Sequence, residues 1–215
     1  TLTPVADYNG QVNLSYSVSD GSLSTSASRS FTLAAVNDAP TATNLTQTVS
    51  YAEDAASVAL GDIVVSDSDS GSVTATLTLN TPAAGVLTTS GAANYNTASG
   101  VWTITDTVAN VNTALAAVSF TPAANGDQDT TITTLIRDAS GSGPAPGTIT
   151  LDVTAVNSAP TTTDDSKIVV KNTTATLSLS DFGYYSDPEG DPLAAIKIAT
   201  LDRKSTRLNS SHVSQ

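Results

Sequence analysis

Apolar and polar residues alternate along several short segments of this chain. In the clearest segments Val, Leu, Ile, Ala or Tyr alternates with Ser, Thr, Asn or Asp, at residues 12–18, 73–79 and 149–153. Such alternation places one row of side chains on each face of a β-strand, and Thr and Val suit a strand with one wet face. Turn-forming residues separate these segments, at 20–21, 99–100 and 138–143. Short strands with turns between them predict an all-β fold of antiparallel β-sandwich modules.

One segment has helical periodicity instead. In an Ala-rich stretch, apolar residues recur at the spacing of one helix face, at Val108, Val111, Leu115 and Val118. Thr105 and Asp106 precede this stretch and are good N-cap residues. We therefore predict one short helix over residues 107–117 that crosses an end of the sandwich, followed by a strand at 119–120.

The sequence repeats itself after 118 to 120 residues, which indicates tandem modules. Three anchors recur in the same order: residues 3–6 and 121–124, Asp20 and Asp138, and residues 35–41 and 155–161. The last anchor contains Ala-Pro-Thr in both copies, and Pro makes a short, semi-rigid linker because it fixes φ. These anchors predict the C-terminal part of one module at 1–38, a complete module at 39–157, and the N-terminal part of a further module at 158–201.

The charge balance restricts the partners of the chain. The 215 residues include 20 acidic and 8 basic residues, a formal net charge of −12, and no Cys. An acidic surface repels nucleic acid and anionic membranes but suits hard cations with oxygen ligands. Without Cys there is no disulfide framework, thiol chemistry or Cys-based zinc site. No run of 18 apolar residues exists, so no membrane-spanning helix is expected.

The last residues differ from the rest in composition. Arg203, Lys204 and Arg207 are three of the eight basic residues, and His212 is the only His. Residues 202–212 resemble the translation of a widely used short-read sequencing adaptor. We interpret residues 202–215 as a non-native tail and exclude them from the fold prediction; the alternative is a genuine basic tail.

Catalysis finds little support in the sequence. The single His lies in the suspect tail and there is no Cys, so neither a His-based relay nor a Cys nucleophile is available. Glu53 and Glu189 are the only Glu residues and lie in different predicted modules, whereas glycoside hydrolysis needs two carboxylates across one cleft. No phosphate-binding Gly loop follows a strand into a helix. We expect this chain not to be an enzyme.

A calcium site is the main candidate for chemistry. Asp187, Glu189 and Asp191 alternate in a turn beside Gly190, and Asp67 and Asp69 form a weaker pair. Ca²⁺ takes six to eight oxygen ligands in irregular geometry, which a carboxylate-rich loop can supply. The competing interpretation is a solvated acidic β-turn, since Asp-Pro-x-Gly is also a good turn sequence.

Three motifs in order resemble the cadherin-like and tandem Ig-like repeats of giant bacterial surface proteins and adhesins. They are Thr-Pro-x-x-Asp-Tyr-Asn-Gly at 3–10, Val-Ser-Asp-Gly at 18–21 and Val-Asn-Asp-Ala-Pro at 36–40. The segments at 181–183 and 186–193 look like the start of another such module. The resemblance covers nearly all of residues 1–201. It implies a cadherin-like or Ig-like sandwich, export to the cell surface or medium, and a role in adhesion or as an extender stalk.

In cadherin-like arrays, calcium ions lie at the junctions between modules. By this resemblance the candidate ligands are Asn37, Asp38, Glu53 and Asp54 at the first junction, and Asp164 and Asp165 at the second. The chain departs from the pattern in three places. Ser158 replaces Asp38 in the second linker, and Asp67-Ser68-Asp69-Ser70-Gly71 replaces the Asp-Pro-x-Gly-Asp loop. The middle module also has Asn-Gly-Asp-Gln-Asp at 125–129 where the first has Asp-Tyr-Asn-Gly at 7–10. We therefore expect two module subtypes, and metal sites need not recur in each.

The leading hypothesis is a fragment of a larger secreted protein that acts as a Ca²⁺-stabilised spacer and adhesion array. Its partners would be neighbouring modules of the same chain, and surface glycans or proteins. One alternative is a carbohydrate-binding module that stacks a sugar on Trp102, although a half-buried strand position is favoured for this residue. Another is an accessory linker of a large secreted enzyme.

Overall fold

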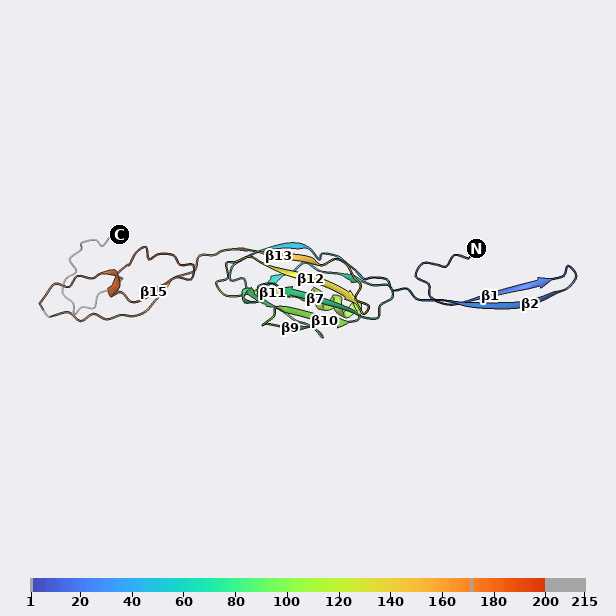
Figure 1. Cartoon of the computed structure of the whole chain (residues 1–215). Helices are drawn as coiled ribbons and strands as arrows, with labels where there is room; N and C mark the ends of the chain where they lie inside the picture. Colours follow the sequence, from blue (N-terminus) through green and yellow to red (C-terminus); the bar gives the residue numbers. More distant parts are fainter. Residues whose placement is uncertain (1, 171, 200–215) are drawn as a thin grey trace. The chain divides into compact units, whose positions relative to one another are not determined.

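The computed structural model describes residues 2–170 and 172–199, and the chain forms two compact units, Thr1–Ala155 and Val156–Gln215 (Figure 1). The fold is all-β with one short α-helix, as the alternation of apolar and polar residues predicts. The adaptor-like residues 202–212 lie outside the described residues, so their interpretation stays a prediction.

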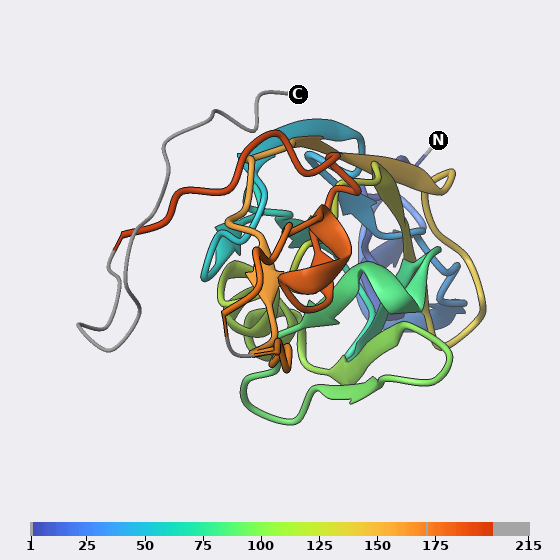
Figure 2. The same ribbon diagram turned by 90° about the vertical axis from the view of Figure 1, so that its left-hand side faces the viewer.

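Six strands of the first unit form one large sheet. In spatial order they are β4 (Gln47–Ala52), β13 (Gly147–Thr154), β12 (Thr130–Asp138), β7 (Val73–Leu79), β10 (Val101–Asp106) and β9 (Asn94–Asn96). All neighbours are antiparallel except β4 and β13, which are parallel and lie side by side in Figure 1 and in the turned view of Figure 2. Because they are parallel, β4 and β13 end at the same end of the sheet.

A second layer covers one face of this sheet. β5 (Val58–Ala59), β11 (Ser119–Pro122) and β8 (Gly85–Leu87) pair in that order, β3 (Thr41–Ala42) pairs with β6 (Val65–Ser66), and the 3₁₀ turn η1 (Pro82–Ala84) precedes β8. The rings of Tyr51 in β4 and Phe120 in β11 meet edge to face, with their centroids 5.7 Å apart. The two layers therefore share one core and form a β-sandwich.

The alternating segments supply this core. Along β7 every residue from Val73 to Leu79 with an apolar side chain is buried, and each Thr between them lies half-buried on the outer face. The inward positions of the neighbouring strands are filled in the same way, by Trp102, Ile104, Ile132, Ile136, Ile149 and Leu151. The period-two pattern thus identifies both the strands and their inner face.

The predicted helix is confirmed as α1 (Val108–Ala116), which connects β10 to β11. Its N-cap is Thr107, whose hydroxyl accepts the Asn110 N–H at 3.4 Å, so the N-cap prediction at Thr105 and Asp106 is wrong. Asp106 ends β10 and accepts the Thr107 N–H at 2.7 Å. The helix packs on β6, β7 and β10 and buries Val111, Ala114 and Leu115.

A separate hairpin precedes the sandwich. It consists of β1 (Gly10–Ser19) and β2 (Ser24–Leu33). Val12 of β1 pairs with Phe31 of β2. The residue 118 positions after Val12 is Thr130 and the residue 120 positions after Phe31 is Leu151, and these two pair between β12 and β13. The hairpin therefore has the same register as β12–β13. The division at 38/39 stays a prediction, because the first compact unit includes both the hairpin and the sandwich.

The second unit also repeats a piece of the first. Its described elements are β14 (Thr161–Thr162), the 3₁₀ turn η2 (Leu179–Asp181) and β15 (Tyr185–Ser186). β14 pairs Thr161 with Ser186, and β3 pairs Thr41 with Ser66, so the same pairing recurs after 120 residues.

Candidate functional site

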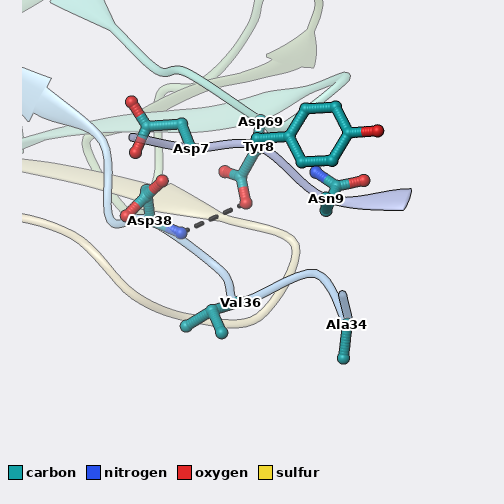
Figure 3. A pocket seen from close by; sticks show the side chains of 7 residues that line it. All are labelled: Asp7, Tyr8, Asn9, Ala34, Val36, Asp38 and Asp69. Carbon is teal, nitrogen blue, oxygen red and sulfur yellow. Dashed lines mark hydrogen bonds between the residues drawn. The ribbon is translucent and has the colours of Figure 1, made fainter. Parts of the chain in front are cut away.

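The linker and the loop after β6 meet at the N-terminal end of the sandwich. The Asp38 N–H donates to Asp69 Oδ2 at 3.2 Å (Figure 3), and Ser68 Oγ donates to Asp38 Oδ2 at 3.2 Å. Asp67 folds this loop, because its Oδ1 accepts the N–H groups of Asp69 at 3.1 Å and Ser70 at 2.7 Å. Asp67 Oδ2 is buried and has no hydrogen-bond partner within the described residues. The structure therefore brings Asp67 and Asp69 together with the linker residue Asp38.

Asp138 completes this end of the sandwich. Its Oδ2 accepts the Asn37 side-chain amide at 2.8 Å, and its Oδ1 accepts the Ser140 N–H at 2.9 Å, the Ser140 hydroxyl at 2.7 Å and the Ser142 N–H at 2.8 Å. The bond from Asn37, with those from the two serines, lowers the pKa of Asp138 to about 2. Asp138 was not among the predicted ligands, although Asp20 and Asp138 form one of the three repeat anchors.

A pocket lies beside this cluster (Figure 3). Its lining residues are Asp7, Tyr8, Asn9, Ala34, Val36, Asp38 and Asp69. Three of the seven are carboxylates, and they come from the segment before β1, from the linker and from the loop after β6. The pocket is therefore acidic, as a cation site requires.

The donor chemistry of this end suits Ca²⁺, because all the candidate side chains offer amide or carboxylate oxygen. However, within residues 2–170 and 172–199 no three or more acidic or His side chains are grouped closely enough to hold a metal ion. Here the carboxylates accept hydrogen bonds from the protein. A bound ion would have to replace some of these donors.

Glu53 and Asp54 lie at the opposite end of the sandwich. Glu53 follows β4, and its N–H donates at 2.9 Å to the carbonyl of Thr154, the last residue of β13. Asp54 Oδ1 accepts the Asn125 N–H at 2.9 Å. The predicted grouping of Glu53 and Asp54 with the first linker is therefore wrong, because β4 carries the chain across the whole sheet before Glu53 is reached.

Asp129 lies at this C-terminal end as well. Its Oδ1 accepts the Val153 N–H at 2.9 Å. Burial, followed by the charges of Asp129 and Glu53, raises the pKa of Tyr51, which indicates that both acids act on the same phenol. Glu53 itself is buried, with 4% of its surface exposed. Asp129 was not a predicted ligand. It ends the acidic stretch at residues 125–129, which takes the place in the repeat of residues 7–10.

In the second unit, Asp187 folds the loop that contains Glu189 and Asp191. Asp187 Oδ1 accepts the N–H groups of Glu189 and Asp191, each at 3.1 Å. Gly190 has a φ of 79°, a left-handed conformation that favours Gly and closes the turn. The Ser158 N–H donates to Glu189 Oε2 at 3.2 Å, so this loop also contacts its linker.

The predicted ligands Asp164 and Asp165 are placed elsewhere. Both are exposed and follow β14, and Asp165 Oδ1 accepts the Ser166 N–H at 2.7 Å. Among the described residues, no hydrogen bond joins either of them to the loop of Asp187. The structure therefore does not group Asp164 and Asp165, the ligands predicted at the second junction, with the acidic loop that contacts the linker at Ser158.

Trp102 is fully buried in the large sheet, and its indole N–H donates to the Thr88 carbonyl at 3.1 Å. A buried ring cannot stack on a sugar. The carbohydrate-binding alternative therefore loses the residue on which it depended, and the interpretation of Trp102 as a strand residue is favoured.

Comparison with known proteins gives limited matches. The sequence profile of a family described as cadherin-like domain matches residues 1–34, the region that holds the first two of the three motifs. A search of curated proteins finds no match. Among solved structures, the ectodomain of human desmocollin-1 is similar at 13% identity with a TM-score of 0.34, over 71% of this chain and 28% of that ectodomain. In the described part of the chain, no helix is long and apolar enough to cross a membrane.

Proposed function

We propose that this chain is a run of tandem spacer and adhesion modules from a large extracellular protein, with cadherin-like sandwiches and Ca²⁺ bound near the linkers. The observation that carries the proposal is the recurrence of one linker arrangement after 120 residues. Asn37 and Asn157 each donate to the carbonyl of the next residue, at 3.3 and 3.2 Å, and that next residue donates its N–H to the acidic loop.

Tandem modules account for the other repeated pieces as well. The hairpin β1–β2 corresponds to β12–β13, the last two strands of the sandwich, and β14–β15 corresponds to its first pair, β3–β6. Each repeated piece thus stands where the end or the beginning of a further sandwich would be. In this interpretation the chain positions a binding partner at a distance and performs no catalysis, and bacterial surface adhesins are the proteins it resembles.

Calcium would act where carboxylates of different segments meet. At the N-terminal end of the sandwich, the ligands would come from Asn37, Asp38, Asp67 and Asp69, and at the C-terminal end from Glu53. In the second unit, Asp187, Glu189 and Asp191 would take the same part. Ca²⁺ would neutralise carboxylates that repel one another, which stabilises the folded modules and reduces bending at the linkers. The pocket beside Asp7 is where an ion would join the preceding segment to the linker.

A calcium titration of the full chain tests this proposal. Extracellular modules typically bind Ca²⁺ with dissociation constants of about 10⁻⁴–10⁻³ M, so millimolar Ca²⁺ should raise the melting temperature of the sandwich relative to EDTA. Asp67→Asn combined with Asp69→Asn should remove most of that rise. The matched control is Asp152→Asn, an exposed acid in β13 that accepts a hydrogen bond from Ser50.

Small-angle scattering of the same samples tests the spacer role. If Ca²⁺ restricts the linkers, the maximum dimension should be larger and better defined in Ca²⁺ than in EDTA. An identical scattering profile and melting temperature in both buffers would contradict the calcium proposal. A Ca²⁺ response that Asp152→Asn removes as fully as the loop variant would contradict the proposed location.

A further inference from the structure

Hydrogen bonds between protein groups join the first linker to the sandwich that follows it. The Asn37 amide donates to Asp138 at 2.8 Å, the Asp38 N–H donates to Asp69 at 3.2 Å, and Ser68 donates to Asp38 at 3.2 Å. Hydrogen bonds to a carboxylate are stronger than bonds between neutral groups, and they also fix direction. We call the group Asn37, Asp38, Ser68, Asp69 and Asp138 the clasp.

Part of the clasp recurs in the second unit. Ser158 has no carboxylate, yet its N–H makes the same bond to Glu189 that Asp38 makes to Asp69, in both cases at 3.2 Å. The recurring bond uses a main-chain donor, so it survives a change of side chain at the linker position. The donor residue changes from Asp38 to Ser158 and the acceptor from Asp69 to Glu189, yet the bond is kept. The bond is therefore a feature of the linker fold that both copies share.

We infer that the clasp fastens the first linker to the sandwich after it without a metal ion, so that the chain bends on the N-terminal side of Asn37. In the first linker, the bending segment is then residues 34–36, between the end of β2 and the clasp. These three residues have no regular secondary structure, and Val36 is 80% exposed. This inference concerns the chain without Ca²⁺, because Asn37, Asp38 and Asp69 are also proposed calcium ligands and a bound ion would replace part of the clasp.

In a tandem array, the location of the bending segment determines which residues of each junction can rotate. A linker that is rigid on one side behaves as an extension of the following module, so only a few residues per junction remain free to rotate. Asn37 and Asp138 are then positioning residues, which set the direction in which the chain leaves the sandwich. Ca²⁺ at the pocket beside Asp7 would act on the remaining freedom at residues 34–36.

Backbone ¹⁵N relaxation and amide exchange of the full chain in EDTA test the inference. Order parameters at Asn37 and Asp38 should match the sandwich, about 0.85, while those at 34–36 should be clearly lower. In Asn37→Ala and in Asp69→Ala, the backbone at positions 37 and 38 should become mobile. Asp69→Ala should also make the Asp38 amide exchange about tenfold faster or more, as expected when a hydrogen bond to a carboxylate is lost.

The matched control is Asn94→Ala, because Asn94 is an exposed Asn in β9, the edge strand at the opposite side of the sheet from β4. It should change neither measurement at the linker. Trp102 fluorescence reports whether each variant keeps its folded core. Order parameters below about 0.6 at Asn37 and Asp38 in the unmodified chain in EDTA would overturn the inference. So would linker dynamics that stay unchanged in both clasp variants.

The calcium titration and this relaxation experiment can each fail without the other. A rigid linker in EDTA without any Ca²⁺ response would support the clasp and contradict the proposed calcium sites. A mobile linker in EDTA that becomes rigid in Ca²⁺ would do the opposite.

Discussion

The hairpins β1–β2 and β12–β13 have the same register and opposite environments. In β1–β2 the inward positions are exposed, with 36% of Leu14, 48% of Tyr16, 57% of Val18 and 37% of Phe31 accessible. Their counterparts are all fully buried: Ile132, Thr134, Ile136 and Leu151. β12–β13 is flanked by β7 and β4 and covered by the second layer, whereas β1–β2 is a sheet of its own. Strand pairing is therefore encoded locally, while burial depends on the rest of the module.

The largest expected difference between the two hairpins is in amide hydrogen exchange. A two-stranded hairpin is marginally stable by itself, whereas amides in a sandwich core exchange only when the domain unfolds, at a cost of about 5–15 kcal/mol. Amides of β12 should thus be protected at least about a thousandfold more than those of β1 in the same sample. Equal protection would contradict the comparison, because it would require that the hairpin be covered.

Equivalent core truncations should differ next most strongly. Ile132→Ala removes a fully buried side chain and should destabilise the sandwich by about 2–5 kcal/mol in urea denaturation followed by Trp102 fluorescence. Leu14→Ala, at the corresponding hairpin position, should change the same transition by less than about 0.5 kcal/mol. A comparable loss in both variants would mean that Leu14 contributes to the same core.

Much of the fold could be predicted from local sequence. Period-two alternation identified β1, β7 and β13, and apolar residues at helical spacing identified α1, because both signals depend on residues a few positions apart. The helix N-cap was missed by one residue, since Thr105, Asp106 and Thr107 are all capable caps and only the end of β10 decides between them.

The candidate site was harder to predict because it depends on which end of the sandwich each loop occupies. Glu53 is close in sequence to the first linker, but the parallel pairing of β4 with β13 carries it to the other end. Asp138 is distant in sequence from Asn37, but β12 runs antiparallel to β13 and ends at Asp138, which brings this residue to the linker. The spacing of residues along the sequence does not show whether two distant strands pair in a parallel or an antiparallel direction.

The addition of a single methyl group should reveal a further difference in stability between the two hairpins. Gly147 of β13 corresponds to Ala27 of β2, because Gly147 pairs with Thr134 as Ala27 pairs with Tyr16. A Cβ at Gly147 would overlap the main-chain carbonyl of Leu45, whose backbone cannot easily move. Gly147→Ala should therefore destabilise the sandwich by about 1–3 kcal/mol in urea denaturation, as overpacking does.

The reciprocal change is the control for this prediction. Ala27→Gly alters only the conformational freedom of the hairpin, at a cost of about 0.5–1 kcal/mol that the Trp102 signal of the sandwich should not register. A Gly147→Ala variant as stable as the unmodified chain would show that the loop containing Leu45 can shift without loss.

The smallest expected effect concerns pH and the two equivalent turn carboxylates. The pKa of Asp138 is lowered to about 2, first by the Asn37 amide, from an ordinary value of 3.8. Because its folded pKa lies below its unfolded value, Asp138 stabilises the sandwich above about pH 4, and this contribution disappears as the pH falls toward 2. Asp138→Asn should lower the melting temperature at pH 7 and make its decline between pH 4 and 2 shallower.

Asp20 provides the comparison for that experiment. Its pKa is also lowered, but by the N–H groups of Leu23 and Ser22 in its own turn, and no linker amide reaches it among the described residues. Asp20→Asn should therefore leave the acid dependence of Trp102-monitored unfolding unchanged. The melting temperature of Asp138→Asn could instead fall with acid as steeply as that of the unmodified chain. In that case the carboxylate of Asp138 contributes no pH-dependent stability, and its bond to Asn37 gives no more electrostatic stabilisation than the turn of Asp20 has without such a bond.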